Sequence, residues 1–183
     1  MAAATASQTV GPYWHLIHDP VWADLTRFGA DGEKIVLIGT LSDGDGAPVS
    51  DAAVEIWQAE PPASDSFPGF GRAATDSAGR FRFLTVKPGP VPGRGNALQA
   101  PHIAITLLAR GLLRGLVTRA YFAGDPRNAA DPLLSSIEDP ARRATLIARR
   151  DLAEPGGEDA AQLETWRLDI RLQGNTETVF LEI

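Results

Sequence analysis

Apolar residues recur at every second position in several short stretches of this chain, and this pattern limits it to a sheet-rich fold. Between residues 164 and 172 the alternation is strict, with Trp166, Leu168, Ile170 and Leu172 on one face and polar residues on the other. Such alternation predicts a half-buried antiparallel strand. Apolar stretches of the same kind occur at residues 35–41, 53–59, 79–86, 102–110, 116–122 and 178–183.

The segments between these stretches carry turn and helix signals. Asp43–Gly46 is a strong hairpin signal, and Asp76–Gly79 closes a second turn. One short helix is predicted over 141–150, because Asp139 can cap it and Pro140 suits its first position. Seven or eight short strands with turns between them predict an all-β antiparallel sandwich over residues 34–183. Residues 1–33 are expected to form an irregular N-terminal arm.

The composition narrows the classes of function. A chain of 183 residues predicts one domain, and its net charge of -6 argues against nucleic acid as a partner. The absence of cysteine excludes disulfides and thiolate metal sites, and it suits a cytoplasmic protein. No signal peptide and no apolar run of about 20 residues is visible, so we expect no membrane partner.

The stretch 86–121, VKPGPVPGRGNALQAPHIAITLLARGLLRGLVTRAY, resembles the metal-binding region of the intradiol ring-cleaving dioxygenases. In that family a KPGPYP-type turn supplies a tyrosinate, and a PHIHF-type strand start supplies two histidines. Val91 replaces the tyrosine here and Ala104 replaces the second histidine, so only His102 remains. Neither valine nor alanine has a lone pair to give to iron(III).

The other tyrosinate of the family comes from a loop that resembles residues 60–72. This loop offers Phe67 and Phe70 instead, and the chain's only tyrosines are Tyr13 and Tyr121. A lone histidine at a strand start is more often a hydrogen-bonded core residue than a ligand. The resemblance therefore implies a vestigial site at Val91, His102 and Ala104, with no metal bound by this chain.

Further motifs extend the resemblance over nearly the whole length, and they point to the two-chain members of the family, which cleave protocatechuate. These motifs are SQTVGPY at 7–13, WQA at 57–59, TRAYF followed by GDP at 118–126, and RLDIRLQGNTETVFLEI at the carboxyl end. In those enzymes a β subunit holds Fe(III), whereas a homologous α subunit keeps the fold. The resemblance implies that this chain is α-type, with a β subunit as partner in an αβ hetero-oligomer and an aromatic small-molecule substrate at their interface.

The resemblance also implies which residues reach that substrate: Thr9, Gly11, Pro12, Tyr13 and Arg110. A guanidinium can pair with a carboxylate through two parallel hydrogen bonds, and a Gly-Pro step lets the backbone come close with little entropy left to lose. The alternative for Arg110 is a solvated charge at a strand end. Tyr13 and Trp14 are equally suited to anchoring the arm by burying aromatic area.

Two other functions are open at this stage. The segments 39–60 and 75–83 also match transthyretin-like (prealbumin-like) sandwiches, which serve as structural or binding modules without catalysis. A self-sufficient iron dioxygenase conflicts with the missing ligands. The acidic residues Glu55, Glu60 and Asp76 show no second carboxylate at a catalytic spacing, so paired-carboxylate chemistry has no support.

Overall fold

The computed structural model describes residues 10–11, 13–93, 95, 97–153 and 162–182, and it is built mainly from β-strands. Nine of the described strands form one large sheet, and β5 and β6 form a separate pair. The prediction of a sheet-rich chain is confirmed. The described part has more strands than the seven or eight predicted, because β3, β5, β6 and β9 carry too few alternating apolar residues to be recognised.

The large sheet contains β1 (Lys34–Ser42), β2 (Ala53–Trp57), β3 (Phe70–Ala74), β4 (Arg80–Val86), β7 (His102–Leu108), β8 (Leu116–Phe122), β9 (Ile147–Arg150), β10 (Glu164–Arg167) and β11 (Ile170–Arg171). The small pair is β5 (Val91–Pro92) with β6 (Leu98–Gln99). The helices are α1 (Trp14–Ile17), α2 (Pro132–Ser136) and α3 (Pro140–Ala144), with 3-10 turns η1 (Pro20–Ala23) and η3 (Pro126–Ala130).

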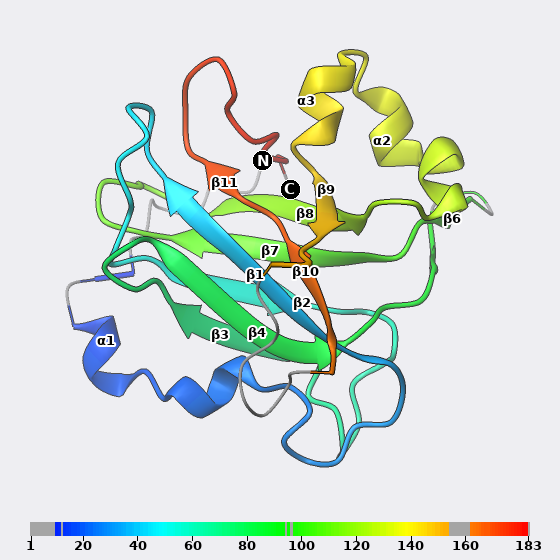
Figure 1. Cartoon of the computed structure of the whole chain (residues 1–183), viewed down its shortest axis with the longest axis horizontal. Helices are drawn as coiled ribbons and strands as arrows, with labels where there is room; N and C mark the ends of the chain where they lie inside the picture. The colour runs from blue at the N-terminus through cyan, green and yellow to red at the C-terminus, as the bar shows by residue number, and fades with distance from the viewer. Residues whose placement is uncertain (1–9, 12, 94, 96, 154–161, 183) are drawn as a thin grey trace, which may run out of the picture.

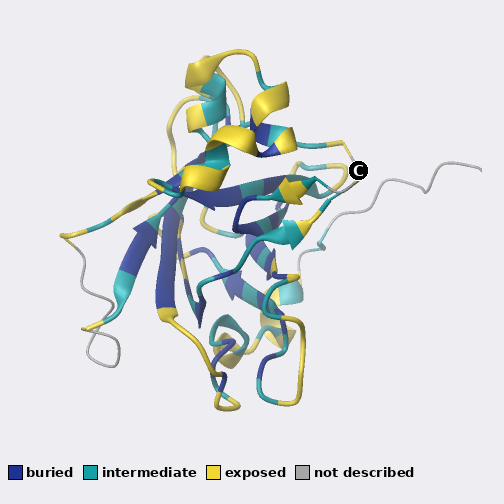
Figure 2. Ribbon diagram, turned by 90° about the vertical axis from the view of Figure 1, so that its right-hand side faces the viewer, coloured by how far each residue is buried: buried dark blue, intermediate teal, exposed yellow. Residues whose placement is uncertain are grey.

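The large sheet folds back on itself around one core. Its strand order is β11-β1-β10-β9-β8-β7-β2-β3, with β4 on the other side of β1. Strand β9 joins the two halves, since it pairs antiparallel with β10 and parallel with β8. Figure 1 shows β4, β1 and β10 lying in front of β2, β7 and β8, and Figure 2 shows the buried residues between the two halves.

Strand β1 is buried on both faces, which explains its nearly continuous apolar sequence. Ile35, Leu37 and Leu41 enter the main core. Val36 and Ile38 point the other way, into a smaller cluster with Leu84 and Leu163. A strand covered on both sides loses the polar positions of a half-buried strand. β1 therefore serves as a central strand, antiparallel to β4 and parallel to β10 and β11.

The single antiparallel strand predicted over 164–172 is wrong in part. Its buried face is confirmed, because Trp166, Leu168 and Ile170 are all buried. However, the segment divides into β10 and β11, and both pair parallel with β1. At the break the Leu168 amide donates to the Ile38 carbonyl over 2.9 Å. The Asp169 carboxylate then accepts from the Thr40 amide, also over 2.9 Å, in place of a ladder bond.

The helix predicted over 141–150 is also shorter than expected. Asp139 caps α3 by accepting from the Ala141 amide, and Pro140 is its first residue, as predicted. The helix ends at Ala144, because residues 147–150 form β9 between β8 and β10. The prediction of one helix fails too, since α1 and α2 are present. At the carboxyl end, residues 178–182 make one bridge, Val117 to Leu181, rather than the predicted strand.

The N-terminal segment runs along the outside of the sheet before entering the core. Turn η1 contacts β3 and β4 (Figure 1), and Leu25 and Ala30 are buried in the main core. None of the helices in the described part of the chain is long and apolar enough to cross a membrane.

We predict that Gly39→Ala destabilises the fold by about 3 kcal/mol, because Gly39 of β1 contacts the segment between β10 and β11. A Cβ at Gly39 would lie 2.0 Å from the Leu168 carbonyl oxygen and 2.5 Å from the Phe81 ring. Gly46→Ala is the matched control: its φ of +87° disfavours alanine, but nothing lies within 4 Å, so about 1–2 kcal/mol is expected. Urea unfolding compares the two variants, and equal losses would contradict the packing argument.

Candidate functional site

His102 begins β7 and lies opposite Tyr121 of β8, with their ring centroids 5.3 Å apart. Its Nδ1 is 2.8 Å from the Ala100 carbonyl oxygen. A carbonyl can only accept, so Nδ1 carries the hydrogen. Burial lowers the pKa of His102 below its ordinary value, with Arg119 adding to the effect. His102 is therefore a neutral residue that is held in place by the backbone.

The two positions that lack the expected ligands are joined through other side chains. Val91 pairs with Gln99 across the β5–β6 hairpin, and Ala104 lies directly opposite Arg119 in the β7–β8 ladder. Arg119 in turn donates from Nη1 to Gln99 Oε1 over 2.8 Å. Val91 and Ala104 are thus linked through an amide and an arginine, and the vestigial site at Val91, His102 and Ala104 stays a prediction.

A buried hydrogen-bond network continues from Arg119. Its Nη1 also donates to the Tyr121 hydroxyl over 3.1 Å, and that hydroxyl donates to Asp131 Oδ1 over 3.1 Å. Asp131 is completely buried and accepts three further bonds, from the amides of Ala100, Leu133 and Leu134. Burial raises the pKa of Tyr121 to about 12. The only phenol near His102 is therefore neutral at physiological pH and already hydrogen-bonded on both sides.

These residues do not fit an iron(III) centre of the intradiol type. His102 is a single imidazole, the Tyr121 hydroxyl is already bonded to Arg119 and Asp131, and the described residues contain no group of three or more His, Cys, Asp or Glu that could hold a metal. The loop 60–72 adds no metal ligand, since Phe67 is buried in the core and the Phe70 ring packs on Trp57, with ring centroids 5.1 Å apart. A metal site in proteins needs several converging donors, and here they are replaced by apolar and cationic groups.

A second cluster lies where the N-terminal segment meets the turn after β7. A cavity of about 260 Å³ is lined by Val10, Gly11, Trp14, His15, Asp51 and Arg110. The structure thereby brings together Gly11 and Arg110, two of the five residues that the sequence nominates. Gly11 has a φ of +78°, which a residue with a side chain rarely adopts.

Arg110 is 83% exposed, and its Nε lies 2.5 Å from Asp51 Oδ2. Asp51 was not predicted as a site residue, and its position in the turn before β2 gives no sequence signal for this pairing. An exposed ion pair of this kind contributes about 0–1 kcal/mol. A carboxylate ligand can therefore compete with Asp51 for the guanidinium at small cost.

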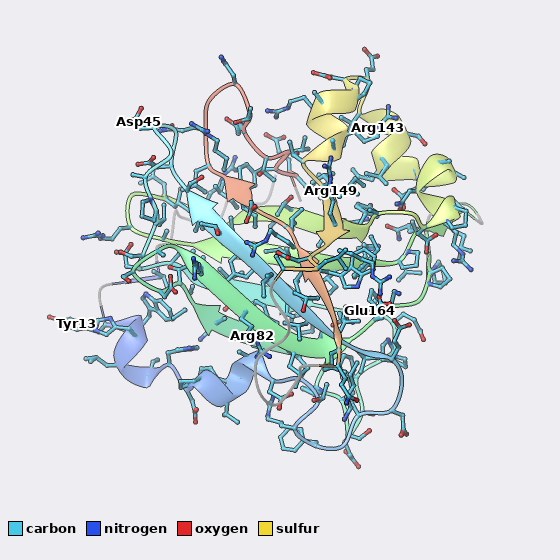
Figure 3. The ribbon with its side chains drawn as sticks, in the orientation of Figure 1. Tyr13, Asp45, Arg82, Arg143, Arg149 and Glu164 are labelled. Atoms are coloured by element: carbon cyan, nitrogen blue, oxygen red, sulfur yellow. The ribbon has the colours of Figure 1, made fainter. Side chains whose placement is uncertain are left out.

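The remaining predicted residues are not gathered at this cavity. Tyr13 is 72% exposed, precedes α1 and does not line the cavity. Figure 3 shows its side chain pointing away from the sheet. Thr9 and Pro12 lie outside the described residues. Trp14 lines the cavity and contacts His18 at the end of α1, with ring centroids 5.4 Å apart and the rings tilted. The substrate-contacting roles of all five predicted residues stay predictions.

Comparisons with known proteins agree with this description. The sequence profile of a family described as "Dioxygenase" matches residues 15–174. The chain is 40% identical to the protocatechuate 3,4-dioxygenase alpha chain of Pseudomonas putida, over 97% of this chain and 96% of that one. It is 39% identical to the beta chain of the enzyme of that name from Burkholderia cepacia, over 66% of this chain and 57% of that one.

A solved structure gives the same result. The dioxygenase domain of a dioxygenase and carbohydrate-binding fusion protein from Streptomyces sp. SirexAA-E superposes with a TM-score of 0.62, at 26% identity. The superposition covers 97% of this chain and all of that one. A profile match over most of the chain, 40% identity over nearly its full length and a shared fold have one explanation: the chain belongs to the intradiol dioxygenase family.

Proposed function

We propose that this chain is the non-catalytic α-type subunit of a protocatechuate 3,4-dioxygenase. It would complete the substrate pocket of an Fe(III)-bearing β subunit that cleaves 3,4-dihydroxybenzoate with O2 to 3-carboxy-cis,cis-muconate. The observation that carries the proposal is the 40% identity to an alpha chain over 97% of this sequence, combined with Val91 and Ala104 at the ligand positions. Similarity of that extent disfavours the alternative of a transthyretin-like module without catalysis.

The cavity at Arg110 is the part of this chain that we assign to the substrate. Protocatechuate carries a carboxylate, and Arg110 presents a mostly exposed guanidinium beside Gly11. Gly11 lines this cavity, and substrate contacts by Thr9, Pro12 and Tyr13 stay part of the proposal. In this arrangement Asp51 holds Arg110 in place until the substrate carboxylate exchanges with it.

Residues around this cavity also favour a protein partner. Leu16 and Ile17 on α1 are 70% and 73% exposed, and Leu113 in the turn after Arg110 is 74% exposed. Large apolar side chains at one end of a chain are typical of a surface that a partner covers. We therefore propose that residues 1–33 form an arm that contacts the β subunit, and that 34–183 form a transthyretin-like sandwich within a cytoplasmic enzyme.

We predict that the chain assembles with a β-type chain and self-associates or aggregates without it, because an obligate interface typically buries about 2,000 Å² or more. The double variant Leu16→Glu/Ile17→Glu should weaken the assembly. Leu152→Glu is the control, since Leu152 is 91% exposed on a different loop. Co-expression followed by analytical ultracentrifugation measures both, and a clean monomer at micromolar concentration would count against the proposed partner.

The purified chain is expected to be colourless and free of iron, because the site at His102 offers one imidazole and one tyrosine whose hydroxyl is already bonded to Arg119 and Asp131, so no tyrosinate is expected there for a charge-transfer band. Metal analysis and a visible spectrum of the chain, with the β-type chain as the positive control, test this. Stoichiometric iron with a visible band would show that the chain has a metal site of its own.

Arg110→Ala in the assembled enzyme should lower kcat/KM for protocatechuate about 10- to 150-fold, the value of one charged hydrogen bond of roughly 1.5–3 kcal/mol. The loss should be smaller for catechol, which has no carboxylate to pair with arginine. Steady-state kinetics on both substrates measure the difference, and iron content should not change.

Arg127→Ala is the matched control, because Arg127 is an exposed arginine that pairs with Asp125 on η3. It should leave both substrates unaffected. Equal losses on protocatechuate and catechol for Arg110→Ala, or no loss at all, would mean that Arg110 is only a surface charge.

A further inference from the structure

A second cavity, of about 360 Å³, lies between the β5–β6 hairpin and the start of α2. Its volume is at the lower end of the range for small-molecule pockets. One lining residue is charged, one is an amide, and the others are apolar or glycine. The lining residues are Gly93, Ala97, Gln99, Arg119, Pro132 and Leu133.

Arg119 supplies the charge, and its bonds leave that charge without a direct counter-ion. Both hydrogen bonds of its Nη1 go to neutral acceptors, Gln99 Oε1 and the Tyr121 hydroxyl. Among the described residues no carboxylate lies within 4.0 Å of the guanidinium, and its Nε and Nη2 make no hydrogen bond. Three N–H donors of a fixed, planar group are thus available.

Asp131, the acidic residue next in the network, is not the counter-ion of Arg119. Asp131 is not among the lining residues, and the Tyr121 hydroxyl stands between it and Arg119. Its two oxygens already accept four hydrogen bonds, from Tyr121 and from the amides of Ala100, Leu133 and Leu134. Asp131 therefore fixes the tyrosine that orients Arg119, from the side away from the cavity.

Gln99 holds Arg119 from a second direction. Its Oε1 accepts from the guanidinium, and its Nε2 donates to the Pro92 carbonyl of β5 over 3.2 Å. Both ends of the amide are used, so Gln99 has a fixed orientation. An arginine held by two neutral partners is preorganised. Binding a ligand therefore costs little entropy for ordering the arginine side chain.

We propose that this cavity binds a small organic monocarboxylate with a compact apolar body, of the size of benzoate. Its carboxylate would pair with the free edge of Arg119 through two parallel hydrogen bonds, and its ring would lie against Pro132 and Leu133. This site is additional to the proposed role of Arg110 and needs neither a metal nor a reaction.

Isothermal titration of the assembled enzyme with benzoate, and with its neutral analogue benzamide, tests the assignment. Arg119→Met removes the charge but keeps the length of the side chain, and Leu133→Trp fills the cavity from the opposite wall. Each variant should lose one benzoate site per chain or weaken it about 10- to 100-fold, and benzamide should bind the original protein at least 10-fold more weakly than benzoate. Arg127→Met should leave this site unchanged.

Leu133→Trp keeps the test decisive if Arg119→Met disturbs folding, because the Leu133 side chain takes no part in the network. A benzoate site in the partner subunit would persist in both variants and is counted separately by stoichiometry. The proposal is wrong if both variants bind benzoate as the original protein does, if benzamide binds equally well, or if millimolar benzoate gives no site on this chain.

Discussion

The buried carboxylate of Asp131 is the interaction on which this end of the molecule depends. It accepts from the Ala100 amide before β7, from the Tyr121 hydroxyl of β8, and from the first two free amides of α2. Each bond contributes about 1 kcal/mol, but an unpaired partner left in the core would cost more. One side chain therefore fixes the relative positions of a strand start, a neighbouring strand and a helix.

That network also occupies the place where the family resemblance implies metal ligands. The family resemblance leads us to expect a tyrosinate and an imidazole at positions 91 and 104. Val91 is instead paired with Gln99 and Ala104 with Arg119, and a hydrogen bond joins Arg119 to Gln99. The cross-links between β5–β6, β8 and α2 are then made by hydrogen bonds within the protein. His102 fits this environment as a neutral, backbone-bonded residue, since burial lowers its pKa.

Much of the fold could be predicted from the sequence, because β2, β4, β7 and β8 each present a period of two and β1 is a continuous apolar run bounded by turn signals. The division of β10 from β11 could not, since it arises where the Leu168 carbonyl passes over Gly39, a contact between residues far apart in the chain. The helix boundary failed for the same reason: residues 147–150 suit a helix locally, but pairing with β8 and β10 makes them a strand.

The site shows the same limit of local reasoning. Sequence motifs identified His102 and Arg110, but neither the Asp51 that pairs with Arg110 nor the bonds of Asp131 to Ala100 and Tyr121 could be predicted from local sequence. Two of the three arginines of the β7–β8 hairpin, Arg110 and Arg119, show why partners matter. Arg110 is exposed and its Nε is paired with the Asp51 carboxylate, so part of its charge is already balanced. Arg119 is partly buried and held by neutral groups, so its charge is already available. Identical side chains on one hairpin are thus suited to different tasks, and the difference lies in what each one touches.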